Sequence, residues 1–274
     1  MSMSLNNNLA SSFIKRHLDK NQKEMTTAVR QISSGERISS ASEDAAGIAI
    51  STHMNAGRKS LGQALKNANQ GVSMSQTAEG ATAEISNIII RLRELSIQSA
   101  SDTLGDGERS LSDLEFQSLI QHIDQIAENS QFNGRKLISG ASEDIGVQVG
   151  THSGSENSIN VGSNINLSAG GLGLKGLSIH SKDAAQSNIG MLDGALRNVG
   201  EARASLGATQ NRMQSSINNL EVSGTNLDSS YSRIHDADLA LTTANYLRSD
   251  ALQKTSTAVL AQSNSLGKDS LRLL

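Results

Sequence analysis

The side chains best suited to chemistry are an adjacent histidine and aspartate, His235 and Asp236. Such a pair can hold a metal ion, but a catalytic metal site also needs further His, Asp or Glu ligands on neighbouring elements. The other histidines, at positions 17, 53, 122, 152 and 180, show no ligand spacing. The chain has no cysteine, which removes thiol catalysis, disulfides and Cys-based zinc sites. The sequence therefore predicts no catalytic centre, no metal site and no cofactor.

A second stretch that could bind a ligand is the serine-rich segment SSGERISSASEDAAG, at residues 33–47. A phosphate-binding loop would continue with Gly-Lys and then Ser or Thr, and this segment does not. Gly35 suits the left-handed position that ends a helix. Ser40 and Glu43 have the spacing of a capping box, in which the serine hydroxyl accepts a hydrogen bond from the next helix and the glutamate reaches back to the serine amide. The segment is predicted to end one helix and begin another.

The elements on either side of this connector follow a seven-residue apolar repeat. In the C-terminal half, eight positions carry the repeat without a miss: Leu192, Val199, Leu206, Met213, Leu220, Leu227, Ile234 and Leu241. Such a repeat keeps one side of a helix against a partner and predicts a coiled coil. A continuous helix over these positions would be about 75 Å long at 1.5 Å per residue. After Leu241 the phase shifts, and a second repeat follows with Leu252, Val259, Leu266 and Leu273.

The N-terminal half mirrors this pattern. Leu18, Met25 and Ile32 repeat at seven, and apolar positions at helical spacing resume after the connector and continue to residue 126. Only the middle of the chain changes period. Apolar residues alternate there over 145–149, 159–161 and 165–167, around a turn-like segment at 151–155, which predicts a small β-hairpin region. The predicted fold is mainly α: long antiparallel coiled-coil helices, with the N- and C-terminal helices paired and a small β-hairpin region in the middle.

Composition excludes several classes of function. The formal net charge of −3 provides no global attraction to nucleic acid or to an anionic membrane, and neither is predicted as a partner. No apolar run approaches the length of a transmembrane helix. The first residues lack the order of basic segment, apolar block and small-residue cleavage site that marks a secretory signal. We therefore expect a protein that either remains in the cytoplasm or leaves it by a route without cleavage.

Several ordered motifs resemble the conserved ends of the bacterial flagellins. In the N-terminal half these are QISSGERI (31–38), SEDAAGIAIS (42–51), NANQG (67–71), QTAEG (76–80), RELSIQ (93–98) and QFNG (131–134). In the C-terminal half they are LGATQNRM (206–213), INNL (217–220) and SRIHDAD (232–238). The resemblance covers nearly the whole chain. The chain is similar to a minimal flagellin, because the hairpin region leads straight into the returning helix without a large central surface insert.

The resemblance implies a division of the chain into layers. Residues 1–34 and 240–274 would form a terminal-helix inner core, and residues 35–42 and 237–239 would be the connectors. Residues 43–236 would form the outer core, with the β region at about 138–178. The implied function is that of a structural, non-enzymatic subunit of the flagellar filament, which is secreted uncleaved through the flagellar type III channel. The implied partners are further copies of the chain, an export chaperone, and the hook–filament junction and cap proteins.

Two sets of site residues follow. The terminal repeats, Leu18, Met25, Ile32, Leu252, Val259, Leu266 and Leu273, are predicted to drive assembly, because exposed apolar side chains gain about 1.5–3 kcal/mol each on burial. We expect the terminal helices to be poorly ordered in the free subunit and to fold on assembly.

The second set concerns innate recognition. The resemblance places the surface seen by the vertebrate Toll-like flagellin receptor at Arg91, Leu95 and Glu115. The alternative interpretation makes Leu95 a core residue and Arg91 and Glu115 partners in ion pairs between subunits.

Two other protein classes compete with the filament subunit: a hook–filament junction protein and a cytoplasmic coiled-coil signalling protein.

Overall fold

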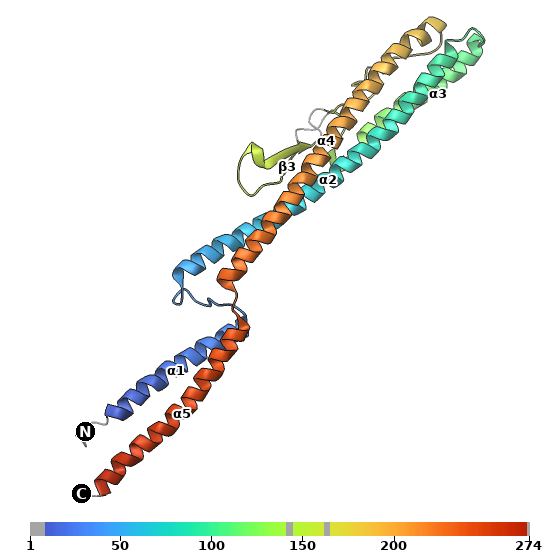
Figure 1. Cartoon of the computed structure of the whole chain (residues 1–274). Helices are drawn as coiled ribbons and strands as arrows, with labels where there is room; N and C mark the ends of the chain where they lie inside the picture. Colours follow the sequence, from blue (N-terminus) through green and yellow to red (C-terminus); the bar gives the residue numbers. More distant parts are fainter. Residues whose placement is uncertain (1–8, 141–144, 162–164, 273–274) are drawn as a thin grey trace. The chain divides into compact units, whose positions relative to one another are not determined.

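A computed structural model of the chain describes residues 9–140, 145–161 and 165–272. These residues form five long helices, α1 (Leu9–Ser34), α2 (Ala45–Ser99), α3 (Asp106–Asn129), α4 (Lys182–His235) and α5 (Leu239–Arg272), shown in Figure 1. Short strands lie between α3 and α4, and α1 packs on α5. The predicted fold class is therefore confirmed. The chain divides into two compact units: a terminal unit, from the described residues of 1–58 and 226–274, and a central unit, from those of 59–225.

The central unit has one apolar core, to which α2, α3 and α4 all contribute. Its largest fully buried side chains on these helices are Ile85, Ile89, Leu92, Phe116, Ile123, Leu192, Val199, Leu206 and Met213. They recur at intervals of three, four or seven, so each helix turns one apolar stripe inward. The repeat predicted from Leu192 to Met213 is thus core packing within the subunit.

The heptad pattern continues further along the chain than the helix does. Leu220, Leu227 and Ile234 are only half-buried, α4 ends at His235, and Leu241 belongs to α5 and is exposed. The eight positions of the repeat therefore do not lie on one continuous helix, because α4 and α5 are separate helices. The reason is local: the Asp238 carboxylate accepts a hydrogen bond from the Leu241 N–H at 3.0 Å and so caps a new helix.

The predicted hairpin region is confirmed. Strands β3 (Ile145–Gln148) and β4 (Ser158–Val161) pair antiparallel, with Ile145 opposite Val161, and the 3₁₀ turn η1 (Ser155–Asn157) precedes β4. A second, shorter hairpin was not predicted: β1 (Gln131–Phe132) pairs with β2 (Arg135–Lys136). The turn between these two strands is Asn133-Gly134, and both residues have positive φ. Asn-Gly is the strongest short-range signal for such a turn, so the sequence did contain it.

Helix α3 fastens the irregular segment that follows β4. The buried Asp113 carboxylate accepts a hydrogen bond from the Ile179 N–H at 2.7 Å, and Asp124 accepts one from the Ala169 N–H at 2.7 Å. Gln117 donates to the Leu177 carbonyl. Each bond satisfies a backbone group that no ladder or helix would satisfy. The chain between β4 and α4 is therefore held on α3 by side chains.

Candidate functional site

Helices α1 and α5 form an antiparallel pair within the terminal unit (Figure 1). Two side-chain hydrogen bonds define its register: Ser11 to Asn264 at 3.4 Å and Gln253 to Gln22 at 2.6 Å. The two bonds are eleven residues apart on each helix, so the register of the pair is the same at both bonds. We call the contact between them the terminal seam.

The predicted assembly residues do not fill this seam. Leu18 and Met25 are half-buried, and Ile32 is 37% exposed. Leu252 and Val259 are 45% and 48% exposed. The side chain of Leu266 and the whole of Leu273 lie outside the described residues. The repeat on α5 therefore does not mark the side of the helix that packs on α1.

The apolar side chains of α5 instead form an outward stripe. Leu241, Leu252 and Val259 are separated by eleven and seven residues, which are about three and two helical turns, so they project from one side of the helix. We call these three residues the outward stripe. Leu247 on α5 and Leu9, Phe13 and Val29 on α1 are also exposed. Apolar side chains gathered on an exposed helix pair mark an interaction surface.

The connectors on either side of the pair are tied together. Gly35, with φ +74°, ends α1, and its carbonyl accepts a hydrogen bond from the Ala237 N–H at 2.8 Å. The Arg37 N–H donates to the His235 carbonyl at 2.7 Å, and the Arg37 guanidinium donates to the Ile234 carbonyl. A guanidinium on the last carbonyls of a helix also complements the negative end of its dipole. Arg37 therefore caps α4, from a position 197 residues away in the chain. Its sequence neighbours contain no signal for this role.

The predicted capping box at Ser40 and Glu43 is wrong. Helix α2 begins at Ala45, and its cap is Asp44, whose carboxylate accepts a hydrogen bond from the Gly47 N–H at 2.8 Å. Glu43 reaches back to the N–H of Ser39 rather than of Ser40, and it also pairs with Arg30 at 3.2 Å. An aspartate one residue before the helix outcompetes a serine four residues further back, because its carboxylate is within reach of the first-turn amides.

His235 and Asp236 have structural partners within the terminal unit. The His235 ring stacks on Tyr231, its Nδ1 lies 3.1 Å from the Asp236 carboxylate, and its Nε2 lies 3.5 Å from Glu36. Hydrogen bonds from Ser232 and from His235 lower the pKa of Asp236 below its usual value. No group of three or more His, Cys, Asp or Glu side chains that could hold a metal occurs among the described residues. The pair thus contacts the connector that follows α1, through Glu36.

The residues expected at a receptor surface meet on the central unit. The Arg91 guanidinium contacts the Glu115 carboxylate at 2.9 Å and Glu94 at 3.1 Å. These hydrogen bonds, above all that with Glu115, raise the pKa of Arg91 above its usual value. Leu95 is buried in the core at 2%. The ion pair of Arg91 with Glu115 is therefore formed within one chain. Leu95 packs α2 against the core of the central unit and does not face solvent.

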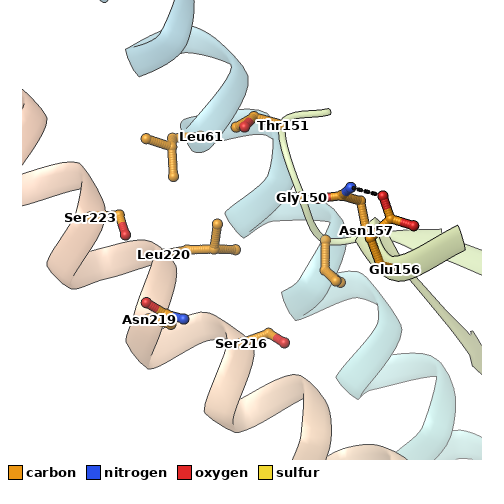
Figure 2. A pocket seen from close by; sticks show the side chains of 10 residues that line it. Leu61, Gly150, Thr151, Glu156, Asn157, Ser216, Asn219, Leu220 and Ser223 are labelled. Carbon is orange, nitrogen blue, oxygen red and sulfur yellow. Dashed lines mark hydrogen bonds between the residues drawn. The ribbon is translucent and has the colours of Figure 1, made fainter. Parts of the chain in front are cut away.

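A groove of about 340 Å³ lies between the hairpin tip and helices α2 and α4 (Figure 2). Leu61 and Leu220 point toward one another across its floor, and Ser216, Asn219 and Ser223 line it from α4. Its only ionisable lining residue is Glu156, whose carboxylate accepts a hydrogen bond from Asn157 at 3.4 Å. A nucleophile, a base and an orienting group do not converge there, so the groove has no catalytic arrangement.

No helix, over the residues that the structure describes, has the length and apolar character needed to cross a bilayer.

Comparison with known proteins adds to this geometry. Residues 5–143 match the "Bacterial flagellin N-terminal helical region", and residues 189–274 match the "Bacterial flagellin C-terminal helical region". The flagellin of Halalkalibacterium halodurans is 37% identical over 272 residues, which cover 99% of this chain and 100% of that protein. A flagellar filament 30.7 kDa core protein of Treponema maltophilum is 35% identical, again over 99% of this chain and 100% of the relative. The crystal structure of Bacillus cereus flagellin superposes with a TM-score of 0.51 and 27% identity, covering 57% of this chain and 88% of that one.

Proposed function

The chain belongs to the bacterial flagellin family and is a structural subunit of the flagellar filament, and we propose that its terminal seam and outward stripe form the inner layer of that filament. The two family regions leave only residues 144–188 between them, so the chain has no large central insert. In this proposal residues 1–34 and 240–274 form the inner core, residues 35–42 and 237–239 connect, and residues 43–236 form the outer core.

The observation that supports this proposal is the exposure of Leu241, Leu252 and Val259 on α5. A full leucine or valine side chain gains about 1.5–3 kcal/mol when it is removed from water, and the partner helix α1 does not supply that burial. Further copies of the same chain would supply it. If the patch on one subunit meets a different patch on the next, the contacts do not close, and the assembly grows as a helical filament.

The test is elongation of the full chain from preformed filament seeds. The variant Leu252→Ser with Val259→Ser should fail to elongate, because it removes apolar area from the outward stripe without touching the central core. The control Leu252→Met with Val259→Ile keeps the stripe apolar and should elongate like the wild type, as followed by light scattering and electron microscopy. Normal filaments from the serine variant would refute this role for the stripe.

We also propose that the subunit is exported uncleaved through the flagellar type III channel, with the help of a chaperone, and meets the junction and cap proteins outside. The family membership supports this route. The measurement is the intact mass of filament protein recovered from cells: a mass that includes the first residues agrees with export without cleavage. A shortened N-terminus would contradict it.

The last element of the proposal is recognition by the Toll-like flagellin receptor at Arg91 and Glu115. The support is that the two side chains lie together and are half-exposed on the central unit. Arg91→Ala should lower the response of receptor-bearing reporter cells to dissociated subunits. Arg93→Ala is the matched control, because Arg93 pairs with Asp193 on α4 instead. An unchanged response to Arg91→Ala would remove the claim.

A further inference from the structure

A cavity of about 460 Å³ lies along the terminal seam, between α1 and α5, and we call it the seam cavity. Three of its lining side chains are buried: Ala28, Thr242 and Ser249. The Thr242 hydroxyl donates a hydrogen bond to the Asp238 carbonyl at 2.7 Å. Ser249 is 5% exposed, and its hydroxyl forms no hydrogen bond with another described residue. Buried hydroxyls in native proteins normally have a partner, so the cavity presents a polar group to a ligand.

The charged side chains around the seam cavity are mainly cationic. Lys23 on α1 and Arg248 on α5 line it, and neither forms an ion pair with a described carboxylate. Glu24 also lines the cavity, but its carboxylate already pairs with Lys20 at 3.8 Å. An ammonium group, a guanidinium group and a free hydroxyl all donate hydrogen bonds, and the first two also carry positive charge. Their combination favours an anionic ligand such as a carboxylate.

The terminal helices themselves carry a carboxylate that lacks a partner. On these two helices, Glu24 pairs with Lys20, and Asp250 pairs with Lys254 at 2.7 Å. Asp19 on α1 is exposed, and it forms no ion pair or hydrogen bond with another described residue. One subunit thus displays an unpaired carboxylate and a cationic cavity without a counter-charge. Two copies of the chain are therefore electrostatically complementary through these two features.

We propose that the seam cavity of one subunit binds the Asp19 carboxylate of another copy of the chain. Lys23 and Arg248 supply the opposite charge, and the Ser249 hydroxyl supplies a hydrogen bond. The contact joins two different surfaces, so it does not close on itself and is compatible with a growing filament. This inference rests on the proposed function, because it takes a second copy as the ligand. It adds a contact that fixes register to the apolar contact of the outward stripe, because charge pairs discriminate between alignments.

The first experiment measures the critical concentration for elongation of the full-length chain from wild-type seeds. Asp19→Asn should raise it about three- to tenfold, because the cations of the cavity lose their counter-charge. Asp250→Asn is the matched control: it removes the same charge from the other helix, but Asp250 pairs with Lys254 inside its own chain. This control should elongate like the wild type. If Asp19→Asn elongates as well as the control does, the proposal is overturned.

A charge exchange then distinguishes a contact between copies from an effect within one chain. One chain carries Asp19→Lys, and a second chain carries Lys23→Glu with Arg248→Glu. Each should elongate poorly alone, because like charges meet at the contact. An equal mixture should elongate better than either component, because the aspartate of the second chain fits the intact cavity of the first, and the introduced lysine fits the reversed cavity. A mixture that is no better than its components would overturn the proposal.

A free anion is the alternative ligand for the seam cavity, and acetate is the probe for it. If acetate lowers the critical concentration of the wild type and of Asp19→Asn equally, the cavity takes a free anion, and the proposal is overturned. The proposed function is judged separately. A wild type that does not elongate from seeds refutes the filament role, whereas normal elongation of both the wild type and Asp19→Asn overturns only the contact at the seam cavity.

Discussion

Two regions of this chain carry the same seven-residue apolar repeat and use it in opposite ways. In the central unit, Leu192, Val199, Leu206 and Met213 are at most 1% exposed. In the terminal unit, Leu252 and Val259 are 45% and 48% exposed, although their types and spacing are alike. The repeat thus shows that a helix has an apolar stripe, but it does not show whether the stripe is covered by the same chain or by another copy.

The hydrogen bonds of side chains and connectors also differ between the central and terminal units. In the central unit, Asp113 and Asp124 hold backbone N–H groups of the segment between β4 and α4. In the terminal unit, hydrogen bonds of Gly35 and Arg37 join the connector after α1 to the end of α4 and to Ala237. One region is consolidated through its core, and the other mainly at the connectors.

The largest expected effect comes from removing a core ring. Phe116 is fully buried among the helices of the central unit, so Phe116→Ala should destabilise that unit by about 3–5 kcal/mol through lost burial and a residual cavity. Denaturant unfolding followed by circular dichroism measures this loss. Phe13→Ala on α1, where the ring is 58% exposed, should leave the same transition unchanged. Equal effects from the two variants would contradict the comparison.

A smaller loss is expected from the fastening of the segment after β4. Asp113→Ala leaves the buried Ile179 N–H without its acceptor, which should cost about 1–3 kcal/mol in the same unfolding measurement. Asp113→Asn keeps an oxygen at that position and should lose less. If alanine and asparagine are equally tolerated, the bond does not stabilise the central unit.

Glycine replacements should differ in sign between the two regions. Gly35 has φ +74° at the end of α1, so Gly35→Ala places a Cβ in the left-handed region and should cost about 1–2 kcal/mol. Gly80 lies within α2 with open space around it, so Gly80→Ala should stabilise that helix by about 0.5–1 kcal/mol. The first change should raise the critical concentration for assembly, and the second should raise the unfolding midpoint of the central unit. If Gly80→Ala raised the critical concentration for assembly, or if Gly35→Ala left it unchanged, the predicted difference between the two glycines would be contradicted.

The smallest effect is a pH dependence at the connector. The pKa of Asp236 is lowered in the folded chain, first by the hydrogen bond from Ser232 and then by that from His235. A lowered pKa means that the ionised form is favoured on folding. Its contribution is therefore present above the ordinary value of 3.8 and is lost as the pH falls through the lowered folded value. Filament dissociation, followed as the pH is lowered from about 5 to well below 3.8, should show a component that Asp236→Asn removes. An unchanged profile would deny Asp236 this role.

Much of the architecture could be predicted from the sequence, because periodicity acts locally. The three- and four-residue spacing predicted the helices, and the alternation at 145–149 and 159–161 predicted the hairpin that β3 and β4 form. Local competition between caps was harder to predict. Asp44 replaced Ser40 as the helix cap, and Asp238 began a new helix inside an unbroken heptad repeat.

The candidate site was predictable in its residue types and less so in its geometry. The terminal repeats remain predicted assembly residues, whereas the buried positions between α1 and α5 are other residues, including Asn21 and Ser249. The seven-residue spacing of Thr242, Ser249, Ser256 and Ser263 was a visible signal for that polar side of α5. Arg37 had no such signal, because its carbonyl partner lies 197 residues away.

The sequence by itself determined the helical class, the place of the hairpin and the family of the chain. These depend on the spacing of apolar residues and on the order of motifs along the chain. Tertiary structure alone decided which side of α5 meets α1, which aspartates hold the segment after β4, and that Arg91 pairs with Glu115 inside one subunit. The physical reason is that a repeat fixes the angle between side chains on one helix. Which segment covers each side of the helix is decided only when segments distant in the sequence pack together.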